Sequence, residues 1–139
     1  MEGVIVLAVA LLVATGFGLW RKSVDGRVNA HRSAGEVFLT PADLGHELGS
    51  TVTFVQFSTA FCQPCRVNRQ VLGHVAGSTE GVVHVDIDAE SHLDLVRRLG
   101  VTRTPTTFVL DRTGAVRHRA TGALRLDEAR AAAATVANS

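Results

Sequence analysis

Residues 61–66 read F-C-Q-P-C-R, and this hexapeptide holds both cysteines of the 139-residue chain. The C-x-x-C spacing is close to one helical turn, so Cys62 and Cys65 lie on one face of a helix that begins there. At a helix start, unpaired N–H groups and the helix dipole stabilise a thiolate. The hexapeptide therefore predicts an exposed, activated thiol at Cys62 and a second thiol beneath it at Cys65.

The residues around the two cysteines favour redox chemistry over a structural disulfide. Pro64 has no N–H, which is no loss in the first turn of a helix. Arg66 adds a positive charge close to the thiols. A disulfide that closes so short a loop adds little stability to a fold, so we expect a bond that opens and closes.

An alternating pattern of helices and strands surrounds the hexapeptide. A β-branched and aromatic run at 51–57 predicts a strand, and residues 62–76 fit a helix. Thr40 is predicted to cap a helix that ends by Gly49, and Ser91 to cap a helix whose apolar side carries Leu93, Leu95, Val96 and Leu99. Further strands are expected at 82–87, 106–110 and 115–121, a turn at 111–114, a last helix at 126–137 and a short edge strand at 37–39. This order predicts an α/β fold with a mixed sheet and helices on both faces.

With these elements in place, residues 37–137 resemble a thioredoxin-family domain. F-C-Q-P-C-R is similar to the family's W-C-G-P-C-K signature, and Thr104-Pro105-Thr106 is similar to its cis-proline loop entering a strand. The turn at 111–114 matches the family's hairpin, and Gly122 matches a glycine beside the substrate groove. The fold class implied is a thioredoxin-like mixed sheet with helices on both faces.

The resemblance implies a thiol-disulfide oxidoreductase that reduces protein disulfides. Cys62 would attack a substrate disulfide, Cys65 would resolve the mixed disulfide, and Pro105 would be cis and face Cys62. The redox-active disulfide Cys62–Cys65 would replace any bound cofactor. The implied partners are a disulfide-containing protein substrate and a thioredoxin-reductase-like electron donor. The implied substrate-binding residues are Phe61, Gln63, Pro64, Thr104 and Gly122.

Four residues depart from the family pattern. Phe61 replaces a tryptophan, Gln63 replaces a glycine, and Gln70 stands where many members have proline. Gln56 occupies the position of a buried aspartate that helps to move the proton of the resolving thiol. Because glutamine cannot titrate, we expect Gln56 to support Cys65 less effectively than that aspartate, leaving resolution slower or dependent on water.

The N-terminal segment predicts a membrane anchor. Residues 3–20 carry no charge and, as a helix, would be about 27 Å long, close to the thickness of a bilayer's hydrocarbon core. The predicted division is therefore an anchor at 1–21, a linker at 22–36 and a domain at 37–139. The cations after the span place the domain on the cytosolic side of a bacterial cell membrane, with an extracytoplasmic domain as the alternative; they are Arg21, Lys22, Arg27 and Arg32.

Other classes of function fit the sequence less well. A net charge of +1 gives no reason to expect nucleic-acid binding. A structural zinc site needs about four ligands, and Cys62, Cys65 and His74 supply three at most, so no metal is expected. Two alternatives stay open: a membrane-tethered binding or sulfur-carrier module without turnover, and an extracytoplasmic thiol reductase of the cytochrome c maturation type.

Overall fold

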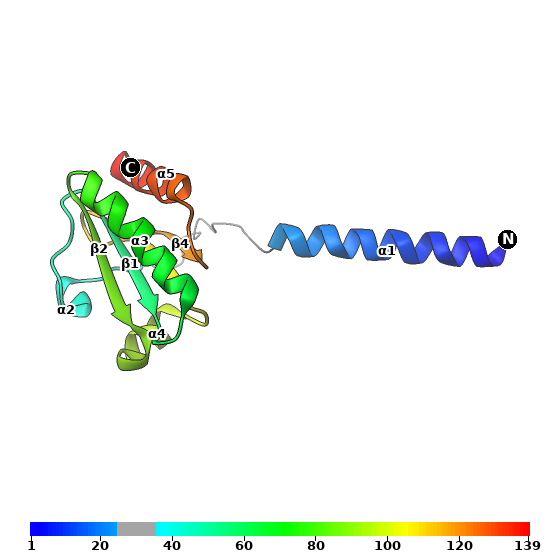
Figure 1. The fold of residues 1–139 in the computed structure, drawn as a ribbon, viewed down its shortest axis with the longest axis horizontal. Helices are drawn as coiled ribbons and strands as arrows, with labels where there is room; N and C mark the ends of the chain where they lie inside the picture. The colour runs from blue at the N-terminus through cyan, green and yellow to red at the C-terminus, as the bar shows by residue number, and fades with distance from the viewer. Residues whose placement is uncertain (25–35) are drawn as a thin grey trace.

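The computed structural model describes residues 1–24 and 36–139, and its centre is a four-stranded sheet (Figure 1). The strands are β1 (Val52–Ser58), β2 (Val82–Asp88), β3 (Thr106–Asp111) and β4 (Val116–Thr121), in the spatial order β2-β1-β3-β4. β1 and β2 are parallel, whereas β3 is antiparallel to both β1 and β4. This arrangement confirms the predicted mixed sheet.

Helices cover both faces of the sheet, as predicted. α3 (Gln63–Ser78) and α5 (Leu126–Ala137) pack together over one face. The opposite face is covered by α2 (Pro41–Leu44) and α4 (Leu93–Leu99), and a 3₁₀ turn, η1 (Ala89–Ser91), leads into α4. α3 runs along the sheet from its first residues, beside the end of β1, toward the start of β2 (Figure 1).

Each face of the sheet has its own apolar core because side chains alternate along a strand. On the α4 face, Phe57 of β1 meets Phe108 of β3 edge to face, with ring centroids 5.8 Å apart. On the α3 face, Phe54 of β1 packs with Leu72 and Val75 of α3. All seven residues of β1 are buried, so this strand is the centre of both cores.

The two short helices differ in detail from their predicted bounds. Thr40 and Asp43 form the expected cap of α2, but the helix ends at Leu44 because Gly45 takes a left-handed φ of 62°. The cap predicted for α4 was wrong by one residue: Ser91 lies in η1 and donates to Asp88, and His92 occupies the N-cap. Leu93 was expected on the apolar side of α4, yet it is 53% exposed.

The short edge strand expected at 37–39 is reduced to a single bridge. Phe38 pairs with Ala115 beside β4. The flanking backbone hydrogen bonds run from Leu39 N–H to the Gly114 carbonyl and from Val116 N–H to the Val37 carbonyl, both at 2.9 Å. This contact fastens the chain to the outer edge of the sheet shortly before α2 begins.

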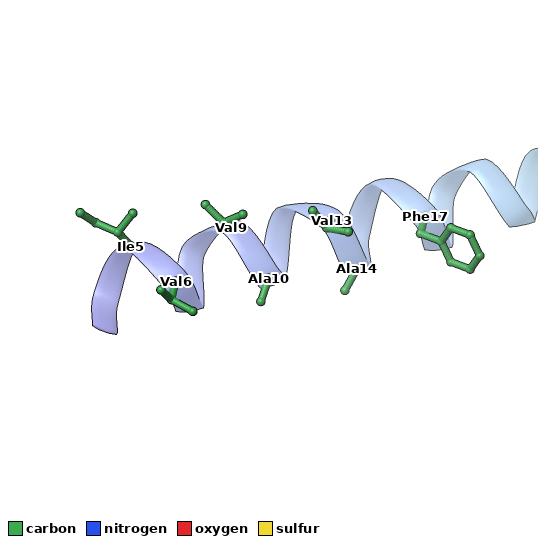
Figure 2. Close-up of a pocket in the computed structure, with 7 residues that line it drawn as sticks. All are labelled: Ile5, Val6, Val9, Ala10, Val13, Ala14 and Phe17. Carbon is green, nitrogen blue, oxygen red and sulfur yellow. The ribbon is translucent and has the colours of Figure 1, made fainter. Parts of the chain in front are cut away.

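The N-terminal residues form α1 (Glu2–Val24), which carries the apolar face drawn in Figure 2. The helix is present, but the transmembrane anchor predicted for 1–21 is not supported. Within residues 1–24 and 36–139, no helix combines the length and the apolar content that a bilayer crossing demands. The predicted linker at 22–36 falls mostly outside the described residues, so its character stays a prediction.

Candidate active site

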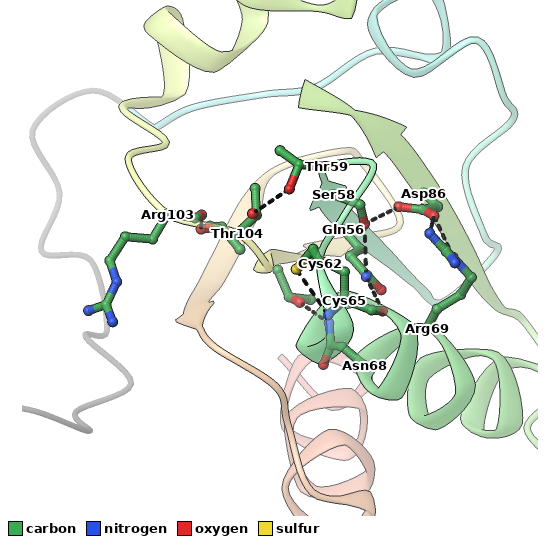
Figure 3. Close-up of a disulfide and its surroundings, with 12 residues drawn as sticks. Gln56, Ser58, Thr59, Cys62, Cys65, Asn68, Arg69, Asp86, Arg103 and Thr104 are labelled. Carbon is green, nitrogen blue, oxygen red and sulfur yellow. Dashed lines mark hydrogen bonds and ion pairs between the residues drawn. A yellow bond between two sulfur atoms is a disulfide. The ribbon is translucent and has the colours of Figure 1, made fainter. Parts of the chain in front are cut away.

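The two cysteines form a disulfide at the N-terminus of α3, close to the end of β1 (Figure 3). Cys62 is the N-cap of the helix, and its sulfur accepts a hydrogen bond from the Cys65 N–H at 3.2 Å. Cys65 is only 1% exposed, whereas Cys62 is half-buried. The cap contact stabilises negative charge on Cys62, so the structure gives the two sulfurs different surroundings.

An exposed rim surrounds Cys62. Phe61 is fully exposed, an unusual position for a large apolar side chain. The side chains of Gln63, Pro64 and Arg66 are exposed as well. These residues therefore offer an apolar and partly cationic surface next to the accessible sulfur, where a disulfide partner can approach.

The loop that precedes β3, distant in sequence from the cysteines, borders the same site. The Thr104–Pro105 peptide bond is cis, which confirms the geometry expected for this dipeptide. The Thr104 hydroxyl lies 3.1 Å from that of Thr59, in the loop between β1 and Cys62, and Figure 3 shows this pair beside the disulfide. Gly122 donates its N–H to the Pro105 carbonyl at 2.8 Å, with a φ of 92° that favours glycine.

Gln56 lies directly beneath the resolving position. It is completely buried in β1, and its Nε2 donates to the Cys65 carbonyl at 2.9 Å. Nε2 also donates to the Ser58 hydroxyl at 3.0 Å. The predicted supporting residue is therefore in contact with the first turn of α3, although the contact reaches the backbone of Cys65.

Further polar residues that the sequence did not single out extend this region from its buried centre to the exposed Asp86 and Arg69. The Ser58 hydroxyl donates to Asp86 at 2.6 Å, and Arg69 of α3 forms an ion pair with the same carboxylate at 2.6 Å. His84 Nε2 lies 3.2 Å from Gln56 Oε1. On the other side of Gln56, Asn68 is fully buried and donates to the Thr107 hydroxyl at 2.9 Å.

Burial determines the charge state of His84. Desolvation lowers the pKa of His84 below its usual value, because the charged imidazolium loses water. Asp86 acts in the opposite direction and Arg69 adds to the lowering. His84 is consequently neutral at neutral pH, which suits a partner in a hydrogen-bond network.

One sequence signal could have revealed these residues. In β2, the run H-V-D-I-D puts His84, Asp86 and Asp88 on one face of the strand, in alternation with apolar residues. That signal identifies a polar face but no partner. The pairing of Gln56 with Asp86 depends on the parallel register of β1 and β2, which the sequence does not specify.

The site can carry out reversible thiol-disulfide exchange with its own residues. Its redox group is the Cys62–Cys65 disulfide, one sulfur accessible and the other buried. Among the residues that the structure describes, no three histidine, cysteine or acidic side chains gather as metal ligands would. With Cys62 accessible and Cys65 buried, the geometry supports attack at Cys62 followed by closure from Cys65.

Comparisons with known proteins agree with this geometry. A family model described as a thioredoxin-like domain matches residues 46–137. A mutant thioredoxin from Halobacterium salinarum superposes with a TM-score of 0.58 at 20% identity, covering 63% of this chain and 76% of that one. A thioredoxin from Nicotiana alata gives a TM-score of 0.55 at 25% identity, covering 63% and 74% of the two chains.

A thioredoxin from Fasciola hepatica also superposes, with a TM-score of 0.55 at 20% identity, covering 63% of this chain and 83% of that one. A search of curated protein sequences finds no match. Likeness at such low identity shows a shared fold, while the family match takes in both the C-x-x-C segment and the cis-proline loop.

Proposed function

Because this chain belongs to the thioredoxin-like family, we propose that it reduces disulfides in protein substrates through a dithiol/disulfide cycle at Cys62 and Cys65. The observation that carries the proposal is the asymmetry of the disulfide. Cys62 caps a helix, accepts the Cys65 N–H and reaches solvent, whereas Cys65 is buried. A nucleophile must be accessible and a resolving thiol must be protected from competing substrates, and these positions meet the two needs.

The proposed cycle has two exchange steps. The Cys62 thiolate attacks a sulfur of the substrate disulfide, a Cys62–substrate bond forms, and the other substrate sulfur leaves as a thiolate. Cys65, after losing its proton, attacks the Cys62 sulfur, the Cys62–Cys65 bond forms and the second substrate sulfur leaves. Two electrons have then passed to the substrate, and a thioredoxin-reductase-like donor restores the dithiol.

The residues around Cys62 support a protein as substrate. Phe61 offers an exposed apolar contact, and the Thr104–Pro105 loop borders the disulfide. We assign substrate contact to Phe61, Gln63, Pro64, Thr104 and Gly122 on this basis. The exposed Arg66 adds positive charge on the same rim.

Insulin reduction driven by dithiothreitol tests the proposal. We expect the parent chain to accelerate precipitation of the insulin B chain and Cys62→Ser to give only the dithiothreitol background. Cys65→Ser, the matched control, should instead accumulate mixed disulfides with insulin. A parent chain that binds insulin without accelerating its reduction would point to a binding or sulfur-carrier module.

A cytosolic location is proposed from the sequence alone, since Arg21 and Lys22 follow the apolar run of residues 3–20. The structure does not support α1 as a bilayer crossing, so the proposal rests on the flanking charge and not on the structure. Labelling of Cys62 by a membrane-impermeant maleimide in intact cells and in lysates tests it. Labelling only after lysis supports a cytosolic domain, and labelling of intact cells supports an extracytoplasmic reductase.

A further inference from the structure

Polar residues beneath Cys65 form a connected hydrogen-bond network that runs from buried Gln56 and Ser58, through half-buried His84, to Asp86, which is exposed. We name Gln56, Ser58, His84 and Asp86 the Gln56 cluster. Gln56 and Ser58 of β1 are 0% and 5% exposed, and His84 and Asp86 come from the neighbouring parallel strand β2. Figure 3 shows Gln56, Ser58 and Asp86 side by side next to the first turns of α3. Buried polar groups in such a network hold one another in fixed orientations.

The contacts set the orientation of the Gln56 amide. A carbonyl can only accept, so the group of Gln56 that faces the Cys65 carbonyl at 2.9 Å must be the donating Nε2. Oε1 therefore faces His84 Nε2 at 3.2 Å and must accept from it. His84 consequently carries a proton on Nε2, whether the ring is neutral or charged.

The second hydrogen of the Gln56 amide is placed in the same way. The Ser58 hydroxyl donates its one hydrogen to the Asp86 carboxylate at 2.6 Å. Its oxygen is then free to accept from Gln56 Nε2 at 3.0 Å. Arg69 fixes Asp86 from the side of α3 through an ion pair at 2.6 Å. Both hydrogens and the oxygen of the amide therefore have defined partners.

We propose that His84 and Ser58 are positioning residues for the resolving step: by orienting the Gln56 amide, they fix the Cys65 carbonyl and the first turn of α3. This inference rests on the proposed function, because it gives these residues a role in the closing step of the cycle. Cys65 is buried and must bring its sulfur to the Cys62 sulfur along one approach. A misplacement of about 1 Å can slow such a step on the order of 100-fold.

The geometry favours positioning over proton transfer for His84. Its Nε2–H serves Gln56 in both protonation states, and the amide between His84 and Cys65 does not titrate. The charged groups that act on His84 are Asp86 of its own strand and Arg69 of α3. A side chain with a donor at the position of Nε2 should therefore replace His84 without loss of function.

A reaction with an aromatic disulfide that releases a coloured thiolate separates the two steps. The reduced full-length chain releases the first thiolate when Cys62 attacks and the second when Cys65 closes the disulfide. Any reactive dithiol undergoes this reaction, so the test holds even if the chain reduces no protein disulfide. Failure of insulin reduction would contradict the proposed function and leave this measurement able to decide the positioning role.

Three variants form the test. His84→Leu removes the donor and should slow the closing step at least about 10-fold, with the Cys62 attack within about 2-fold of the parent. His84→Gln keeps an amide donor and should close within about 3-fold of the parent rate, with a parallel pH profile. His118→Leu is the matched control, because it removes a β-strand histidine that lies outside the Gln56 cluster, and it should change neither step.

Two results with the His84 variants would contradict the positioning role. Parental closing rates in His84→Leu would overturn the proposal, and so would His84→Gln closing as slowly as His84→Leu, because His84 would then act by titration. If His84→Leu does not fold in a urea melt, Ser58→Ala takes its place, since it removes the hydroxyl that receives the second amide hydrogen. It should slow closure selectively, and an unchanged closing rate would contradict the positioning role.

Discussion

The interface between α3 and the sheet has two ends built on different physical principles. At the end far from the cysteines, Phe54, Leu72 and Val75 form an apolar core. At the cysteine end, the same face of the sheet carries the Gln56 cluster and Thr107. The first end is buried and is stabilised by removing apolar surface from water. The second end is buried at Gln56, Ser58 and Thr107, reaches solvent at Asp86, and is stabilised by satisfying each polar group.

The difference between the two ends indicates that one end mainly stabilises the fold and the other mainly orients the reactive start of α3. Apolar packing is non-directional and tolerates small shifts at modest loss. Hydrogen bonds are directional, and a buried group left without a partner costs about 1–3 kcal/mol. The polar end therefore tolerates substitutions less well than the apolar end, but it holds the start of α3, with Cys65, in one orientation.

The largest effect on stability is expected at the apolar end. Phe54→Ala should lower the free energy of unfolding by about 3–5 kcal/mol, because it removes a completely buried ring from the core. Urea denaturation of the oxidised protein measures this loss. The closing rate of the folded fraction should stay near the parental value, and a large selective loss of closure would show that the two ends are coupled.

Gln56→Glu is expected to have the next largest effect, at the polar end. The carboxylate cannot donate to the Cys65 carbonyl or to Ser58, and burial raises its pKa above the usual 4.3 or so. The protonated side chain is tolerated at low pH, and stability is lost as pH rises through the raised pKa. Near pH 8 we expect a deficit of about 2–3 kcal/mol relative to the parent.

Urea melts of the Gln56→Glu variant and the parent between pH 4 and 8 would measure this deficit. Gln56→Met is the matched control, since it has a similar size and no titratable group, and its deficit should not depend on pH. A Gln56→Glu deficit that shrinks as pH rises would contradict the burial argument.

Asn68 stands at the boundary between the two ends, and its loss should have an intermediate effect. Its side chain donates to the Thr107 hydroxyl and accepts the Leu124 N–H, both at 2.9 Å. Asn68→Ala leaves these partners unsatisfied and should lower the free energy of unfolding by about 1–3 kcal/mol. In a double-mutant cycle with Thr107→Val, the two losses should not add. Simple additivity would mean that the buried contact contributes nothing.

The smallest effect is a pH dependence that His84 gives to folding. Its folded pKa is lowered, chiefly by desolvation, from an unfolded value of about 6.5, so the unfolded chain binds more protons between these values. The contribution of neutral His84 to the free energy of unfolding is fully present above about pH 6.5, and it is lost as the pH decreases toward the folded pKa. The parent should therefore gain stability over His84→Gln as pH rises from about 5 to 7 in urea melts. Parallel curves would show that His84 titrates alike in both states.

Local sequence features were sufficient for much of the fold and for the redox group. The start of α3 and the pairing of Cys62 with Cys65 follow from spacing within one turn, and the Thr40 cap from residues three positions apart. Such features depend on residues within one helical turn of each other, and these residues come into contact independently of the tertiary structure. The cis bond before Pro105 followed from the family resemblance, since local sequence alone allows either isomer.

Only the tertiary structure decided what lies beneath Cys65 and which apolar residues are covered. His84 and Asp86 are each 28 positions from the β1 residue they contact, and the parallel register of β1 and β2 brings them there. A shift of one residue in the register between β1 and β2 would turn His84 and Asp86 to the opposite face of the sheet. The packing of both faces of the sheet excludes that shift. The exposure of Leu93 was also decided by the tertiary structure. A helical pattern shows which residues share a face, but the neighbouring elements determine how much of that face is covered.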